Sequence, residues 1–127
     1  MAEVDLKELR DLVRLGGRPD LRGLDLSGMD LSGVAWLAGA DLRGANLSGS
    51  LMVRVDLSGA DLQDADLEGA LLRGARLCGA DLRRANFEGA ELAGADLTGA
   101  RAEGARFGGA HLAVRHPPEG GFLSPEG

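Results

Sequence analysis

The sequence of 127 residues has few aromatic residues, one cysteine and no long apolar run. Aromatic residues amount to 3% and Tyr is absent, although 44% of residues are hydrophobic, so a core must be built from small and aliphatic side chains. Cys78 has no second cysteine for an internal disulfide. No stretch approaches the roughly 20 apolar residues of a membrane span. These features favour a cytoplasmic protein without a membrane partner.

An excess of positive charge is also missing. The net charge is −6 and the isoelectric point is near 4.8. A protein that binds nucleic acid directly usually neutralises phosphates with clustered Lys and Arg, so this balance disfavours direct nucleic-acid binding. The first residues include Glu3, Asp5 and Lys7, where a signal peptide would need an apolar stretch.

Glycine, in contrast, is abundant and evenly spread, with 21 residues along the chain. This distribution reflects a repeat of five residues from Pro19 to Val114, interrupted by one extra residue that we place at Val34. The central position of each unit, called i below, is apolar. The predicted core consists of Leu42, Leu47, Met52, Leu57, Leu62, Leu67, Leu72, Leu77, Leu82, Phe87, Leu92, Leu97 and Phe107.

A period of five matches neither the 3.6 residues of a helical turn nor the alternation of a flat strand. The backbone must therefore turn once in every unit. If each unit is a short extended side followed by a corner, the large residue at i and the small residue at i−2 both point inward. The frequent glycine at i+2 then allows the conformation that the corner requires.

The units Ala40-Asp41-Leu42, Ala45-Asn46-Leu47 and Ala65-Asp66-Leu67 follow the pattern A(D/N)LXX, which resembles the pentapeptide-repeat family. The resemblance covers residues 19–114. It implies an all-β fold: a right-handed quadrilateral parallel β-helix of about five coils, in which four units form one coil and residues about twenty apart stack.

Both ends of such a solenoid need covering. Residues 1–18 are predicted to form a short capping α-helix and a turn, because Leu6, Leu9 and Val13, with Leu12 beside them, lie on one helical face and glycines follow at 16 and 17. Residues 115–127 are rich in Pro and Gly and are predicted to be an irregular tail.

No arrangement of residues predicts catalysis, a cofactor or a metal. His111 and His116 have no plausible nucleophile or carboxylate relay nearby in the sequence pattern, and Cys78 occupies an outward position without a recognisable cationic partner. Aspartates recur at i−1 in most units, which a requirement of the repeat explains without a metal, since Asp and Asn bond readily to nearby backbone amides. We expect a protein that is not an enzyme.

The outward positions, arranged in columns of units four apart, differ from face to face. One column pairs Asp20 with Arg22 and repeats this pairing further on, which predicts a solvated ladder of ion pairs. A second column forms an acidic face, on which fewer basic residues compensate the negative charge of Asp25, Asp66, Glu68 and Glu88. A third exposes an apolar patch of Leu51, Val53 and Leu71. Trp36 is either a surface contact or covered by the capping helix.

Two functions are compatible with these faces. The first is a non-catalytic scaffold or interaction module that binds another protein through the apolar patch. The second comes from the resemblance, because some pentapeptide-repeat proteins mimic DNA, bind DNA gyrase or another topoisomerase, and protect it against quinolones or natural-product poisons. The arginines of the ion-pair ladder count against this alternative. The sequence leaves the partner and the choice between monomer and homodimer open.

Overall fold

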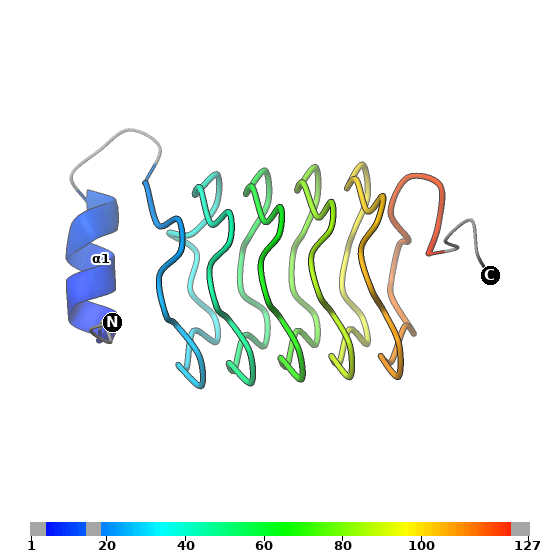
Figure 1. Cartoon of the computed structure of the whole chain (residues 1–127), viewed down its shortest axis with the longest axis horizontal. Coiled ribbons are helices and arrows are strands. Elements are labelled where there is room, and N and C mark those ends of the chain that lie inside the picture. The colour runs from blue at the N-terminus through cyan, green and yellow to red at the C-terminus, as the bar shows by residue number, and fades with distance from the viewer. Residues whose placement is uncertain (1–4, 15–18, 123–127) are drawn as a thin grey trace.

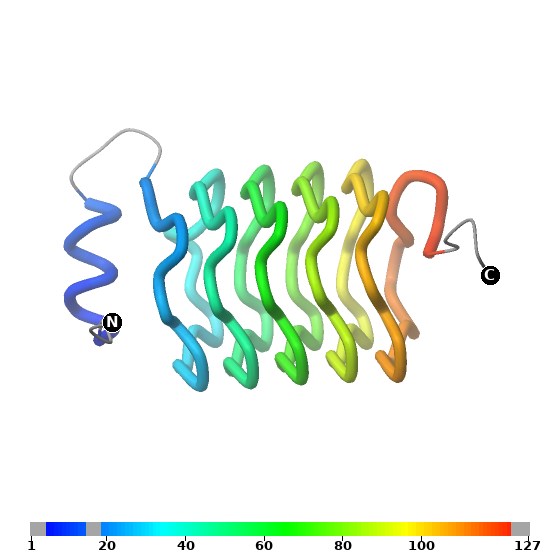
Figure 2. The backbone as a smooth tube through the Cα atoms, viewed as in Figure 1, coloured from blue at the N-terminus to red at the C-terminus, as the bar shows by residue number. Residues whose placement is uncertain are grey.

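The computed structural model describes residues 5–14 and 19–122. One helix, α1 (Leu6–Arg14), lies at one end, and the chain then winds into coils that stack side by side along the long axis (Figure 1). The described residues form no extended strands, only isolated parallel β-bridges between successive coils. The tube in Figure 2 shows the same path, with sharp corners between short straight sides.

The bridges define four faces by the residues at i−1. They link residues 21 apart in the first coil and 20 apart over most of the remainder, so each unit stacks on the unit four further along. The first face carries Asp20, Asp41, Asp61, Asp81 and Arg101; the second Asp25, Asn46, Asp66, Asn86 and Arg106; the third Asp30, Leu51, Leu71, Glu91 and His111; the fourth Asp56, Arg76, Asp96 and His116.

The corners depend on the residue at i+2. Glycines at this position in the repeats have φ between 64° and 75°, a left-handed conformation that is costly for residues with a Cβ. Three units place another residue there in the same conformation: Arg54, Asp64 and Arg84, with φ of 60–61°. These three corners keep the shape of the coil at a conformational cost.

The side chain at i−1 stabilises the turn that follows it. At most units Oδ1 of an Asp or Asn accepts a hydrogen bond of 3.0–3.3 Å from the backbone N–H two residues later, as in the pair Asp66 and Glu68. This is the local side-chain-to-backbone bond expected from Asp and Asn. The repeated aspartates therefore have a structural role.

The core runs along the axis of the coils. Twelve of the thirteen residues predicted for it, from Leu42 to Leu97, are at most 1% exposed. Phe107, the last of the predicted set, is half-buried in the final coils. Its ring stacks on Phe87 with centroids 5.2 Å apart and meets the edge of Phe122 at 4.9 Å. Alanines at i−2, such as Ala65 and Ala85, are also buried.

The extra residue, predicted at Val34, lies one position later, at Ala35. In every other coil the backbone N–H at i−1 donates to the carbonyl of the i−2 residue one coil earlier, as Asp61 does to Ala40. Asp56 donates instead to the carbonyl of Val34 at 2.8 Å, and Val34 packs against the core while Ala35 is exposed. Val34 thus takes the inward position, and the insertion follows it. Trp36, beside the insertion, is half-buried against the core.

Helix α1 begins after Asp5, whose Oδ1 accepts the backbone N–H of Glu8 at 2.8 Å, the geometry of an N-cap. Leu9 is fully buried in the common core and Val13 packs against it, whereas Leu6 and Leu12 are exposed, so the buried face of the helix is narrower than predicted. The predicted stop at residues 16 and 17 lies outside the described residues.

At the other end, stacking continues past Val114, where the predicted tail begins. His116 bridges to Asp96 and Glu119 bridges to Arg101, while Pro118 is buried and Phe122 packs on the core. The first part of the segment 115–127 thus completes the coil stack. Residues 123–127 lie outside the described part of the chain.

Candidate functional site

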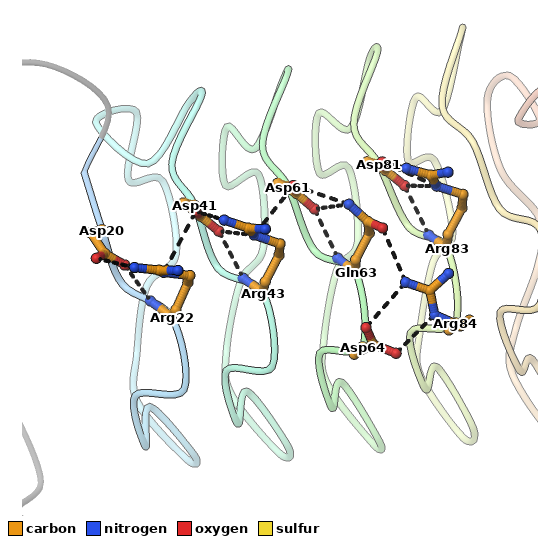
Figure 3. A network of polar contacts seen from close by, with 10 residues as sticks. All are labelled: Asp20, Arg22, Asp41, Arg43, Asp61, Gln63, Asp64, Asp81, Arg83 and Arg84. Carbon is orange, nitrogen blue, oxygen red and sulfur yellow. Dashed lines mark hydrogen bonds and ion pairs between the residues drawn. The ribbon is translucent and has the colours of Figure 1, made fainter.

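The first face carries a ladder of charged side chains, in which Gln63 replaces the arginine of one coil (Figure 3). Arg22 pairs with Asp20 at 2.8 Å, Arg43 with Asp41 at 2.7 Å and Arg83 with Asp81 at 2.7 Å. Arginines also reach the next coil, as Arg43 does to Asp61 at 3.6 Å. Such mutually neutralised, solvated groups offer little net charge to a partner.

The ladder shifts the titration of its members. The side-chain hydrogen bond from Arg22 lowers the pKa of Asp20 from 3.8 to about 2. The side-chain bond to Asp41 raises the pKa of Arg43, and the bond from Arg83 lowers the pKa of Asp81. These groups hold their charges under all physiological conditions. The first face is therefore a structural element of constant, balanced charge.

The second face carries the predicted acidic residues, but its charge is interrupted. Asp25 accepts a hydrogen bond from the Ser27 hydroxyl at 2.6 Å. Asn86 takes the place of an aspartate in the next coil, and its Nδ2 lies 3.5 Å from carboxylate oxygens of Asp66 and Glu68. Glu88 forms an ion pair with Arg106 of the following coil. The coil of Asn46 and Ser48 is neutral on this face, and the last coil, with Arg106, is basic.

The third face differs from the others because leucine replaces the turn-stabilising Asp or Asn. Leu51 and Leu71 are bridged to each other in successive coils, and each is 39% exposed. Val53, half-buried, lies two residues after Leu51. In most units the backbone N–H at i+1 donates to an Asp or Asn at i−1, but the side chain of Leu51 has no acceptor. The backbone N–H of Val53 donates instead to Oγ of Ser32 in the preceding coil, at 3.2 Å. The apolar patch therefore lacks the repeat's usual local hydrogen bond.

An arginine-rich corner lies between the third and fourth faces. A pocket of about 570 Å³ is lined there by Arg54, Gly74, Arg76, Gly94, Asp96 and Arg115. This pocket is not evident in the repeat pattern, because its three arginines come from separate units and one lies in the predicted tail. The only sequence signal is Arg54 itself, which replaces a repeat glycine.

The residues considered for chemistry lie apart from one another. Burial raises the pKa of the Cys78 thiol, which lies 3.9 Å from the carbonyl oxygen of Asp96, so it is not an activated thiolate. His111 Nδ1 lies 2.9 Å from a carboxylate oxygen of Glu91, on the surface of a different face. No group of three potential metal ligands occurs in residues 5–14 and 19–122. Nor does that part of the chain contain a helix with the length and apolarity needed to cross a membrane.

The family model for pentapeptide repeats matches eight copies over residues 35–74 and 70–109, more than half of the chain. The chain belongs to the pentapeptide-repeat family. Structures of this family are right-handed β-helices, and the bridges 20 or 21 residues apart agree with that fold. No curated protein matches the sequence.

Several solved structures are similar to this pentapeptide-repeat protein. The pentapeptide-repeat protein alr5209 from Nostoc PCC 7120 is 28% identical, with 90% of this chain and 97% of that chain covered and a TM-score of 0.69. HetL, from Nostoc sp. strain PCC 7120 and involved in the regulation of heterocyst differentiation, is 30% identical over 87% of this chain, with a TM-score of 0.60. The chain spans only 48% of the length of HetL.

A third similar structure is QnrB1, a plasmid-mediated fluoroquinolone resistance protein. It is 22% identical over 72% of this chain and 47% of its own, with a TM-score of 0.53. At this identity the likeness is one of fold.

Proposed function

We propose that this chain is a non-catalytic interaction module that binds another protein through the apolar patch of Leu51, Val53 and Leu71. The observation that carries the proposal is the replacement of Asp or Asn by leucine at two stacked outward positions. The repeat itself gains nothing from these leucines, because an aspartate there would stabilise the turn. Binding to another protein explains the two exposed leucines better than a contribution to folding.

The patch is suited to a protein surface in both chemistry and geometry. Parallel bridging holds the two leucines in adjacent coils, so a partner meets a rigid pair of side chains and little ordering entropy is lost. Fully burying a leucine contributes roughly 1.5–3 kcal/mol, so covering the exposed 39% of each contributes about 1 kcal/mol. The pair then accounts for a change in Kd of about 30-fold.

The test uses the double variant Leu51→Asn/Leu71→Asn. Asparagine occupies the same position at Asn46 and Asn86, so the variant is expected to fold and to regain turn hydrogen bonds. Proteins captured from the source cells by the wild type are purified, and their affinity for each form is measured by calorimetry. We expect the variant to bind a genuine partner about 30-fold more weakly.

The matched control is Asp66→Asn/Glu68→Gln on the second face, which is expected to bind the partner like the wild type. Equal affinity of all three forms would refute the proposal. Light scattering of the free proteins provides a second check. If the wild type is a dimer and the leucine variant a monomer, the patch binds another copy of the chain and the proposal of a separate partner is wrong.

The alternative function is mimicry of DNA toward DNA gyrase or another topoisomerase. The observation in its favour is the acidic second face with Asp25, Asp66 and Glu68. The interruption of this face by asparagines and by Arg106 weakens it. In a gyrase supercoiling assay with and without fluoroquinolone, we expect no inhibition and no protection. Protection that is lost in Asp66→Asn/Glu68→Gln would instead establish the alternative.

We further propose that α1 shields the first coil, that the repeats form about five coils, and that the protein works in the cytoplasm. Burial of Leu9 in the common core supports the capping role of the helix. Leu9→Ala should therefore expose the first coil, which increased self-association in sedimentation experiments would reveal.

A further inference from the structure

The pocket at the corner of the third and fourth faces concentrates positive charge in a protein whose net charge is −6. Arg54, Arg76 and Arg115 reach it from three different coils. A Cβ placed on Gly74 would lie 3.4 Å from Cγ of Arg54, so the Arg54 side chain extends over the bare backbone of the next coil. The glycines at 74 and 94 keep the pocket open between the arginines.

Arg54 occupies its position at a conformational cost. Its φ of 60° falls in the left-handed region, in a position that is glycine in most units. Asp64 and Arg84 occupy equivalent corners, but they form an ion pair with each other at 3.0 Å, which explains their presence. No carboxylate among the described residues forms an ion pair with Arg54. Strained residues that the fold does not use are characteristic of binding sites.

Two more arginines, Arg76 in the pocket and Arg73 directly before Gly74 in the sequence, are also incompletely neutralised. Arg76 is 3.9 Å from Asp56 and Arg73 is 3.8 Å from Glu91, at the outer limit of an ion pair, and both side chains are about two-thirds exposed. This contrasts with the ladder of the first face, where the short pairs measure 2.7–2.8 Å. The positive charge of the corner is therefore available to a ligand.

The arginine corner and the apolar patch are continuous. Arg54 directly follows Val53, and Arg73 lies two residues after Leu71 on the same face. We propose that the two form one composite docking surface for a protein segment that carries acidic side chains next to apolar ones. Arginine binds carboxylates through two parallel hydrogen bonds, which would orient the segment along the face. This inference rests on the proposed function and adds the chemistry of the partner.

The observations favour a peptide carboxylate over the phosphates of a nucleic acid. The net charge of the chain, −6, repels an extended polyanion, whereas a short peptide brings only a few negative charges to the corner. An apolar patch beside the pocket is suited to aliphatic or aromatic side chains, whereas a backbone-tracking nucleic-acid site needs a longer basic stripe.

The experiment selects binders from a phage-displayed library of random 16-residue peptides. The immobilised proteins are the wild type, Arg54→Gln/Arg76→Gln and Leu51→Asn/Leu71→Asn, each first verified as folded by circular dichroism. We expect wild-type binders enriched in Asp or Glu beside apolar residues. A synthetic copy of the most enriched peptide should bind the arginine variant about tenfold more weakly, as for the loss of one charge-assisted hydrogen bond. Raised salt should reduce this difference.

The outcomes separate the inference from the proposed function. Binders without acidic enrichment, or acidic binders unaffected by the arginine changes, would overturn the inference while leaving the apolar patch in place. Peptides that bind all three proteins equally, or no peptide enrichment at all, would contradict both. A fluorescein-labelled 20-nucleotide single strand of DNA is tested in parallel. If it binds the wild type at 150 mM salt and loses binding in Arg54→Gln/Arg76→Gln, the corner serves nucleic acid and the inference is wrong.

Discussion

The stacked core makes a quantitative prediction at Leu67. This side chain is fully buried, and it belongs to the same column as Leu47 and Phe87 in the coils before and after it. Its backbone N–H donates to the carbonyl of Asn86 at 2.7 Å, so backbone hydrogen bonds hold adjacent coils at a set separation. Leu67→Ala would leave a cavity that these bonds prevent from collapsing. We expect a loss of about 3–5 kcal/mol in the free energy of unfolding, the upper part of the range for such truncations.

The measurement is urea-induced unfolding followed by circular dichroism, with the free energy extrapolated to water. The control is Glu68→Ala, an exposed neighbour, which should change stability by no more than about 0.5 kcal/mol. A loss below about 1 kcal/mol for Leu67→Ala would mean that the column is not rigidly packed. Wild-type stability in Leu67→Asp, or a far-UV spectrum dominated by helix, would refute the coil arrangement itself.

Two further predictions concern the corners and the ladder. Replacing Arg54 by glycine should raise the free energy of unfolding by about 1 kcal/mol in the same assay, because glycine adopts the left-handed conformation without strain. Arg84→Gly should raise it by less, because this variant also loses the ion pair with Asp64. An equal increase for the two variants would contradict this reasoning. Arg22 holds the pKa of Asp20 near 2, below the ordinary 3.8. The stability from this pair is therefore present above pH 4 and is lost as the pH falls toward 2. In Asp20→Asn, the melting temperature should therefore fall less between pH 4 and pH 2 than in the wild type. An unchanged profile of melting temperature against pH would show that the pair with Arg22 does not contribute to stability.

Much of this fold follows from local sequence. The apolar series from Leu42 to Leu97 has a strict spacing, and any structure that buries it must turn once every five residues. Prediction was less accurate where the spacing changes. Val34 and Ala35 are both small enough for the inward position, and it takes the hydrogen bond from Asp56 and the packing of Val34 on the core to show that Val34 fills it. Likewise, nothing in the Pro- and Gly-rich composition after Val114 indicates that His116 and Glu119 pair with the last coils.

The candidate site also has one part that the sequence predicts and one part that only the structure shows. The patch of Leu51, Val53 and Leu71 is predictable because its members share one face once four units make a coil, and their departure from the i−1 pattern is visible in the letters alone. The arginine corner is different. Arg76 belongs to the next face and Arg115 to the predicted tail, so their approach to Arg54 depends on the angle of a corner and the path of the last coil.

The family, the period, the inward column and the outward leucines can all be read from the order of the residues, because each depends only on a unit of five and its departures from the pattern. Which outward residues of different units meet depends on how the coils stack. Contacts such as Glu88 with Arg106, or the shared pocket of Arg54 and Arg115, join residues 18 to 61 positions apart. Their formation depends on coil length, the conformation of each corner and the hydrogen bonds between coils, which no single five-residue unit encodes.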